Sequence, residues 1–220
     1  KNLTKKYEKN KSIKVLNDVS FSFESGKTYS IIGPSGSGKS TLLNLLSLID
    51  NPTTGSIEIS SNKIKLNNKV ENDLIRAKKI GIIYQDKNLL SDFTALENVY
   101  LPNLLITKEK QKSVDLAKKL IKNVGMSTRI NYFPNELSGG ENQRIAIARA
   151  LINDPDIILA DEPTGSLDFE NAKLIFKILF NLKNKKRIII FATHNRYFAN
   201  MADCKIMMNN GNIQIINATA

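Results

Sequence analysis

The sequence contains one cysteine, one histidine and no long uninterrupted run of hydrophobic residues. Cys204 has no second cysteine to pair with, which excludes an internal disulfide and favours a reducing compartment such as the cytosol. No hydrophobic run approaches the roughly 18 residues that a membrane-spanning helix needs, and no secretory signal pattern opens the sequence. Any role at a membrane is therefore expected to depend on a partner protein.

The sequence has fewer acidic than basic residues. It contains 21 aspartates and glutamates and 32 lysines and arginines, which gives a formal net charge of +11. Such a charge fits nucleic acid, anionic lipid or nucleotide as a partner. The lysines are scattered, however, with only short clusters such as residues 183–187, and no aromatic residues are interleaved with them. This distribution favours lysines on solvated faces over a nucleic-acid-binding surface.

One glycine-rich stretch fits the pattern G-x-x-x-x-G-K-[ST] at every constrained position. It follows a β-rich run at residues 28–32 and precedes a hydrophobic helical stretch at residues 41–46. Glycines let main-chain N–H groups turn toward one point, and the start of the helix adds its positive dipole end. In this pattern the lysine reaches the β- and γ-phosphates, and the next hydroxyl holds Mg²⁺. We predict a phosphate-binding loop formed by Gly33, Pro34, Ser35, Gly36, Ser37, Gly38, Lys39, Ser40 and Thr41.

Two kinds of strand are predicted around this loop. Alternating hydrophobic residues at 19–24 and 57–59 are typical of half-buried strands, and they suggest a small antiparallel β layer. Continuous hydrophobic runs at 80–84, 157–160 and 188–192 are instead typical of strands buried on both faces of a parallel sheet.

A terminal hairpin and a helical block complete the pattern. Asn210-Gly211 joins residues 205–208 to 213–216 as a hairpin. Thr94 to Glu97 is a capping-box sequence, and a helical repeat over residues 114–124 ends at Gly125. Residues 62–79 carry no clear pattern.

These patterns predict an α/β fold. It consists of a P-loop NTPase (RecA-like) core with a mostly parallel sheet, an antiparallel β subdomain and an inserted α-helical subdomain. We expect a single domain over residues 1–220, with the core and β layer at about 1–86 and 154–220 and the helical subdomain at about 87–153.

Two adjacent carboxylates end the predicted strand at residues 157–160. Asp161 stands where a phosphate-loop enzyme usually holds the carboxylate that coordinates Mg²⁺. Glu162 is a candidate to orient and deprotonate the attacking water. The alternative for Asp161 is a strand-ending turn residue or a helix cap, which the second carboxylate makes weaker.

A second glycine-containing helix start lies at residues 137–144. Ser138 and Glu141 fit a capping box for the helix at residues 145–152. A cap does not explain the two consecutive glycines between them, because glycine lowers helix propensity. Bare N–H groups at a helix start instead suit a second anionic group.

With these motifs in this order, the sequence resembles the nucleotide-binding subunits of ATP-binding-cassette (ABC) transporters over essentially its whole length. Residues 137–141 match the family's signature motif without a mismatch, although Asn142 and Asn195 depart from residues that the family often has beside its motifs. The resemblance implies ATP and Mg²⁺ as ligands, and it adds Ser138, Gly139, Gly140 and Glu141 to the nucleotide-binding residues.

Four further roles are implied by the resemblance. Tyr7 matches the aromatic residue that stacks on adenine, and Gln85 matches the glutamine that touches Mg²⁺ and couples to the membrane subunit. Residues 166–168, which end at Asp168, match the D-loop. His194 matches the switch histidine near the γ-phosphate, where it positions phosphate and water together with Glu162.

The resemblance also implies partners and a location. Two copies of the ATPase subunit pair head to tail, so that Ser138 to Gly140 of one close over ATP held by the other. Two transmembrane permease subunits contact residues 84–99, and no nucleic-acid partner is expected. The chain is then peripheral, at the cytoplasmic face of the inner (plasma) membrane.

Within the family, residues 89–99 and 160–168 look like the corresponding stretches of lipoprotein-releasing ATPases. The predicted function is therefore ATP hydrolysis that powers the release of lipoproteins from the inner membrane. Macrolide and peptide exporters and a cell-division ATPase share much of these stretches, so they remain alternatives.

Two other classes of ATP- or GTP-hydrolysing protein fit the sequence less well. A GTPase is disfavoured because no asparagine-lysine pair is followed by an aspartate at the position that guanine recognition requires. A DNA-associated ATPase of the same family would separate its two nucleotide motifs by a long coiled coil, whereas Lys39 and Asp161 are separated by a short stretch.

Overall fold

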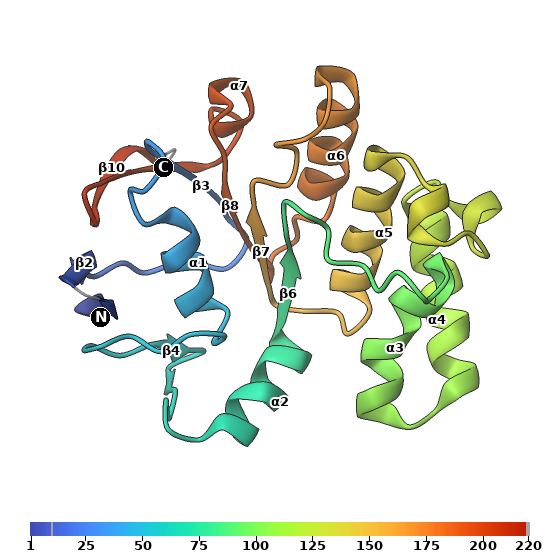
Figure 1. Ribbon diagram of the computed structural model, residues 1–220, viewed down its shortest axis with the longest axis horizontal. Coiled ribbons are helices and arrows are strands. Elements are labelled where there is room, and N and C mark those ends of the chain that lie inside the picture. Colours follow the sequence, from blue (N-terminus) through green and yellow to red (C-terminus); the bar gives the residue numbers. More distant parts are fainter. Residues whose placement is uncertain (10, 219–220) are drawn as a thin grey trace.

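A computed structural model describes residues 1–9 and 11–218. Its centre is a six-stranded sheet in the order β10-β9-β3-β8-β7-β6 (Figure 1). The strands from β9 to β6 are parallel, and β10 is antiparallel to β9. The predicted parallel strands and terminal hairpin are confirmed, with the bounds β3 Thr28–Ile32, β6 Ile80–Ile83, β7 Ile157–Asp161, β8 Ile188–Ala192, β9 Cys204–Asn209 and β10 Asn212–Ala218.

Helices cover both faces of this sheet, and the side chains of β7 and β8 alternate between two hydrophobic cores. Leu159 of β7 packs in the core that contains α1 (Lys39–Leu46). Its neighbours Ile158 and Ala160 pack in the other core, with α5 (Gly139–Leu151) and α6 (Phe169–Asn181). In Figure 1, α1 lies on one side of β7 and β6, and α5 and α6 lie on the other. Burial on both faces explains why these strands are continuously hydrophobic.

Two small antiparallel sheets flank α1, as the sequence suggested. β1 (Leu3–Lys9) pairs with β2 (Lys11–Val19), and β4 (Glu58–Ile59) pairs with β5 (Asn62–Lys63). The strand predicted at residues 19–24 is wrong, because β2 ends where that stretch begins. Phe21 and Phe23 alternate there because both rings pack against Tyr29, with ring centroids 5.8 and 4.9 Å away.

The remaining helices follow the predicted signals more closely. Thr94 caps α3 (Ala95–Thr107) with a complete capping box, and α4 (Lys110–Asn123) ends before Gly125, whose φ is 73°. α2 (Lys69–Lys79) carries no readable pattern because Asn72 is its one buried residue.

α5 begins at Gly139, so the two glycines form its first turn rather than preceding it. α7 spans Arg196–Ala199, and short 3₁₀ turns span Ser127–Arg129 and Pro134–Glu136.

Candidate functional site

Four neighbouring strand ends carry the residues predicted for phosphate binding and hydrolysis. β3, β8, β7 and β6 lie side by side and run parallel, so their carboxyl ends share one edge of the sheet. The phosphate loop follows β3, and His194 follows β8. Asp161 and Glu162 stand at the end of β7, and Gln85 stands after β6. Residues that are distant in the sequence are thereby brought to one edge of the sheet.

The phosphate loop takes a conformation that only glycine tolerates at its start. Gly33 has a φ of 152°, and a Cβ there would stand 2.1 Å from the carbonyl oxygen of Met208. Lys39 is only 6% exposed, and its Nζ donates hydrogen bonds to the carbonyl oxygens of Gly33 at 2.9 Å and Pro34 at 3.0 Å. The ammonium group is therefore held inside the loop rather than in solvent.

Two hydroxyl groups of the loop are placed differently. Ser37 is 3% exposed, and its Oγ has no hydrogen-bond partner within the described residues. A buried polar atom without a partner is rare in folded proteins and suits a site that receives a polar ligand. Ser40 is exposed in the first turn of α1, and the space around Gly36 is open. The loop thus has a buried hydroxyl group, that of Ser37, and open space beside Gly36.

The carboxylates after β7 also contain unpartnered oxygens. Oδ1 of Asp161 is buried and accepts no hydrogen bond from the described residues. Glu162 adopts a left-handed φ of 45°, and its N–H donates to the carbonyl oxygen of Ala192 at 3.1 Å. A left-handed backbone at a residue other than glycine is strained and is commonly found at functional sites.

His194 contacts Glu162 through both its main chain and its ring. Its N–H donates to Oε2 of Glu162 at 3.3 Å, and its Nε2 lies 3.2 Å from Oε1. That approach lacks hydrogen-bond geometry, so Oε1 remains without a hydrogen-bond partner inside the protein. The side chain of Glu162 is 15% exposed, whereas that of His194 is 53% exposed.

The loop after β6, which carries Gln85, is fastened to α5. The Arg149 guanidinium donates to the carbonyl oxygens of Lys87 at 2.7 Å and Asn88 at 2.5 Å. Both of these loop residues have left-handed φ values, 61° and 48°. Burial lowers the pKa of Arg149. The side chain thus holds a strained turn in place from the helix behind it.

The same loop also touches the loop that follows Glu162. Lys87 Nζ donates to Ser166 Oγ at 2.6 Å, and a Cβ at Gly165 would stand 3.1 Å from Gln85 Nε2. Gln143, fully buried on α5, donates from Nε2 to the carbonyl oxygen of Tyr84 at 3.3 Å. The segment from Tyr84 to Lys87 therefore contacts both α5 and the loop after β7.

The predicted capping box at the start of α5 is confirmed. Ser138 Oγ accepts from the Glu141 N–H at 3.3 Å, and Glu141 Oε2 accepts from the Ser138 N–H at 2.8 Å. Arg129 Nε lies 3.3 Å from the other oxygen of Glu141. The pKa of Glu141 is lowered, chiefly by the hydrogen bond from the Ser138 main chain. The hydrogen bonds to the Ser138 hydroxyl and to Arg129 lower it further.

The starts of α5 and α6 lie against each other. A Cβ at Gly140 would stand 2.9 Å from Asn171 Oδ1. Asp168 caps α6, because Oδ1 accepts from the Asn171 N–H at 3.0 Å and Oδ2 accepts from its Nδ2 at 2.5 Å. Ser138 to Glu141 and Asp168 therefore form one surface. Within one chain that surface belongs to the α5 and α6 side of the sheet, whereas the phosphate loop leads into α1 on the other side.

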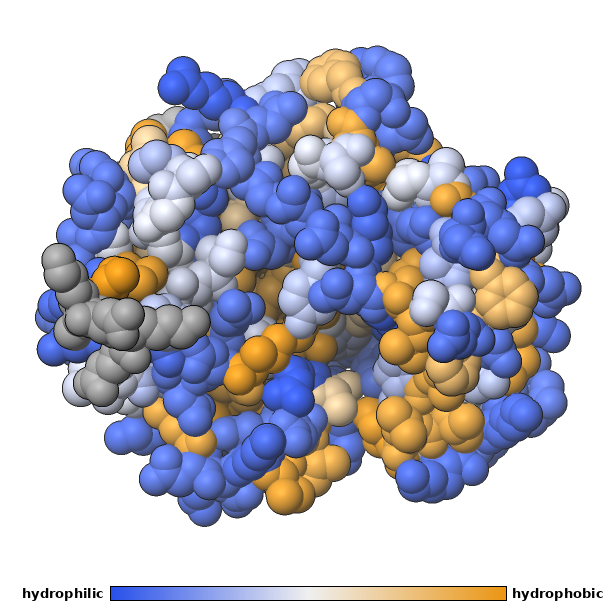
Figure 2. All heavy atoms as spheres, in the orientation of Figure 1, coloured by the Kyte–Doolittle hydropathy of each residue, from blue (hydrophilic) through white to orange (hydrophobic). Residues whose placement is uncertain are grey.

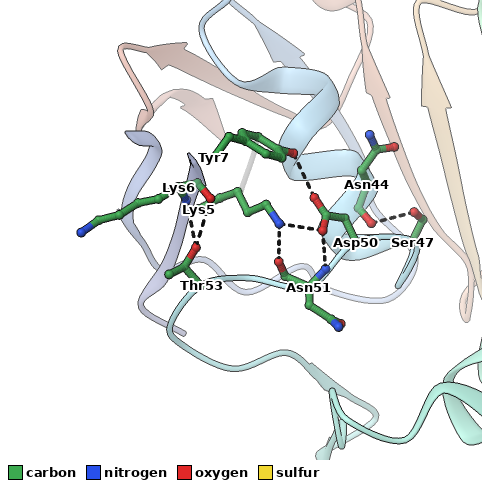
Figure 3. A network of polar contacts seen from close by, with 8 residues as sticks. All are labelled: Lys5, Lys6, Tyr7, Asn44, Ser47, Asp50, Asn51 and Thr53. Carbon is green, nitrogen blue, oxygen red and sulfur yellow. Dashed lines mark hydrogen bonds and ion pairs between the residues drawn. The ribbon is translucent and has the colours of Figure 1, made fainter. Parts of the chain in front are cut away.

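Tyr7 lies on β1, which is not part of the central sheet. Its side chain is 40% exposed, and its hydroxyl donates to Asp50 Oδ2 at 2.9 Å (Figure 3). Asp50 follows the C-terminal end of α1, the helix that starts at the phosphate loop. The sequence had singled out Tyr7 but not its partner.

A model of the ABC transporter family matches residues 16–165 of the chain. The chain belongs to this family. The lipoprotein-releasing system ATP-binding protein LolD of Wigglesworthia glossinidia brevipalpis is 46% identical over 97% of this chain and 94% of that protein. LolD of Rickettsia bellii is 43% identical over 92% of this chain and 90% of its own length.

Solved structures of an ABC cassette show the same fold. The dimeric structure of the ATP-binding cassette MJ0796 in a post-hydrolysis state, bound to ADP and Pi, superposes with a TM-score of 0.92 at 36% identity. It covers 100% of this chain and 97% of that one. A second dimeric structure of that bacterial ABC transporter cassette gives the same values. The predicted family, fold class and ATPase activity are confirmed.

The sequence did not predict three residues that hold the loops of this site or Tyr7 in place. Gln143 shares one face of α5 with Ile147 and Leu151, which are buried at i+4 and i+8. A glutamine on a hydrophobic face is a readable signal for a buried hydrogen bond. Arg149 and Asp50 offered no comparable signal, since their partners are main-chain or distant groups.

Proposed function

We propose that this ABC ATPase powers the release of lipoproteins from a membrane, as the subunit that binds and hydrolyses ATP. The observation that carries the proposal is the gathering of the phosphate loop, Asp161, Glu162, Gln85 and His194 at one edge of the sheet. The identity to LolD proteins over nearly the whole chain supports the lipoprotein as the transported molecule.

The phosphate loop binds the triphosphate through main-chain N–H groups and Lys39. The buried Nζ exchanges the carbonyl oxygens of Gly33 and Pro34 for β- and γ-phosphate oxygens, which accept stronger, charge-assisted hydrogen bonds. The dipole of α1 adds positive potential at the same point. The loop residues from Gly33 to Thr41 all contribute main chain or side chain to this cradle.

The oxygens at this edge of the sheet fit Mg²⁺. The Ser40 hydroxyl, the Asp161 carboxylate and the Gln85 amide are hard oxygen donors, and the buried Oδ1 of Asp161 accepts no hydrogen bond within the described chain. Few protein ligands are needed, because Mg²⁺ keeps water and binds phosphate oxygens as well. When bound, the ion neutralises charge on the β- and γ-phosphates.

Glu162 and His194 carry out the hydrolytic step. The Glu162 carboxylate has one unpartnered oxygen, Oε1, which accepts a proton from the attacking water. The His194 main chain holds the other oxygen, and its half-exposed ring reaches the γ-phosphate side. His194 thus orients the base and the phosphate rather than acting as the base itself.

A complete site needs a second copy of the chain. Ser138, Gly139, Gly140, Glu141 and Asp168 lie on the α5 and α6 side of the sheet, so they face ATP held by a partner rather than by their own phosphate loop. The dimeric arrangement of the related cassette supports this. ATP then joins the two copies, and hydrolysis lets them separate.

The membrane part of the transporter is supplied by two permease subunits. No helix formed by residues 1–9 and 11–218 has the length and hydrophobicity needed to cross a membrane. Leu90 and Phe93 are 50% and 37% exposed within residues 84–99, and Figure 2 shows hydrophobic surface around the neighbouring α3. This stretch is the contact surface for the permeases at the cytoplasmic face of the inner membrane.

The test compares ATP hydrolysis by the chain alone, in vesicles that contain the permease pair of a lipoprotein-releasing system with an acylated lipoprotein, and with double-stranded DNA. Hydrolysis is expected to rise in the vesicles and to accompany lipoprotein release. The Glu162→Gln variant is the control without turnover. Stimulation by DNA alone would overturn the transport function, and coupling only to a macrolide or peptide would reassign it to an exporter.

A further inference from the structure

The hydroxyl of Tyr7 belongs to a network of hydrogen bonds with charged groups (Figure 3). It donates to Asp50 Oδ2 at 2.9 Å, while Asp50 Oδ1 accepts from Lys5 Nζ at 2.6 Å and from the Asn51 N–H at 2.7 Å. The carboxylate therefore receives three hydrogen bonds from three different residues. A group bound in this way has little freedom to rotate, so it fixes the direction of the Tyr7 phenol.

Lys5 holds the network from the other side. Its side chain is 11% exposed, and its Nζ also donates to the carbonyl oxygen of Asn51 at 2.7 Å. The same ammonium lies 4.8 Å from the centroid of the Tyr7 ring. One face of the ring is therefore occupied by a cation, and a planar ligand would stack on the opposite face.

Main-chain contacts join the strand of Tyr7 to the segment that follows α1. The Lys6 N–H donates to Thr53 Oγ1 at 2.9 Å, and the Thr4 N–H donates to the carbonyl oxygen of Thr54 at 3.1 Å. Since α1 starts at Lys39, a single rigid helix about 12 Å long connects the phosphate loop to the segment that holds Tyr7.

The geometry points to Asp50, held by Lys5, as a positioning residue for nucleotide recognition. Through these contacts it fixes the Tyr7 ring relative to α1 and to the phosphate loop at which that helix starts. This inference rests on the proposed function, in which Tyr7 stacks on the adenine ring. It adds a carboxylate that never touches the nucleotide but decides how well the ring receives it.

The protonation states of the pair agree with this geometry. Burial raises the pKa of Tyr7, and the hydrogen bond to Asp50 raises it further, although the Thr41 hydroxyl acts in the opposite direction. Burial also acts to raise the pKa of Asp50, but the hydrogen bonds from Lys5, Tyr7 and Asn51 outweigh it and lower the pKa. Near neutral pH the phenol thus donates to an ionised carboxylate.

The test is a double-mutant cycle of Tyr7→Phe and Asp50→Asn, with binding of ATP and of inorganic tripolyphosphate measured for each variant. Each single variant is expected to bind ATP about 3- to 10-fold more weakly, because one charge-assisted hydrogen bond is lost or weakened. The double variant should lose no more ATP affinity than the single variant that binds ATP less tightly, since both substitutions remove the same interaction. Tripolyphosphate affinity should stay unchanged, and hydrolysis should show a raised KM with an unchanged kcat.

Asp73→Asn is the matched control, since Asp73 also pairs with a basic side chain, Arg76, at 2.7 Å but lies on α2. Independent, multiplicative effects of the two substitutions, or an equal loss of tripolyphosphate affinity, would overturn the role of Asp50. If Asp50→Asn fails to fold, Tyr7→Phe alone decides, and unchanged ATP affinity would overturn it. Tyr7→Ala separates the two claims, because unchanged ATP binding in that variant contradicts base stacking by Tyr7 itself.

Discussion

Gly140 and Asn171 lie so close that a Cβ on the glycine would stand 2.9 Å from the asparagine Oδ1. Gly140 is in the first turn of α5, and Asn171 is in the first turn of α6, where it receives the cap formed by Asp168. The absence of a side chain at Gly140 therefore lets the N-terminal ends of α5 and α6 approach each other. A motif recognised by its likeness to a family thus has a packing role in addition to the role toward nucleotide that we propose for it.

Gly140→Ala should lower stability more than Gly139→Ala. Alanine favours a helix over glycine at both positions, but only at Gly140 would the new methyl group press on Asn171, since a Cβ at Gly139 would have an ordinary contact at 3.4 Å with Leu167. The free energy of unfolding in urea is expected to be about 1–3 kcal/mol lower for Gly140→Ala than for Gly139→Ala. Equal stabilities would contradict the close approach.

Glu162→Gln should keep ATP binding and lose turnover by about 10²- to 10⁴-fold, because an amide accepts no proton from water. The unhydrolysed nucleotide should then hold two copies together, and the variant should elute as a dimer from a sizing column with saturating ATP. Glu170→Gln is the matched control, since this glutamate pairs with Lys173 on the surface of α6. A Glu162→Gln variant that stays monomeric would argue against the two-copy site.

Lys39→Ala should bind ATP about 10- to 100-fold more weakly, since hydrogen bonds from a buried ammonium to phosphate oxygens are among the stronger ones. Titration with a fluorescent ATP analogue measures this change. Lys27→Ala is the control, because Lys27 pairs with Glu24 at 3.0 Å, where β3 begins, at the edge opposite the phosphate loop. Unchanged affinity in Lys39→Ala would refute the role of the lysine.

Arg149→Lys should loosen the loop that carries Gln85. A lysine cannot bridge the carbonyl oxygens of Lys87 and Asn88 as the planar guanidinium does. We expect the free energy of unfolding to fall by about 1–3 kcal/mol and the amides of residues 86–90 to exchange faster with solvent. Arg196→Lys, on the exposed surface of α7, should change neither quantity.

The stability that Asp203 contributes should depend on pH. Burial acts to raise its pKa, but hydrogen bonds from Lys183 and Thr28 outweigh it, so the pKa is lower when folded. A lowered pKa means that the contribution is complete above the unfolded value of about 3.9 and is lost as the pH falls through the folded value. Asp203→Asn should therefore be less stable than the wild type at pH 7, with the gap closing below about pH 4. A gap that is independent of pH would contradict this.

Local patterns predicted most of the elements because burial and capping leave marks in the chain. The runs at 157–160 and 188–192 are hydrophobic throughout since both faces of their strands are covered. The capping boxes at Thr94 and Ser138 depend on residues three apart. The predicted strand at 19–24 failed because aromatic packing around Tyr29 produces the same alternation as a half-buried strand.

The order of motifs along the chain by itself determined the family, the α/β fold and the set of residues that we propose for ATP binding, because each motif is a short stretch whose chemistry is local. Only the tertiary structure decided which of these residues meet. Strand order brought Glu162 to His194 and left Ser138 on the opposite side of the sheet from α1. It also joined Tyr7 to Asp50, a contact between residues 43 positions apart. Such pairings depend on how sheets and helices pack, which no local pattern records.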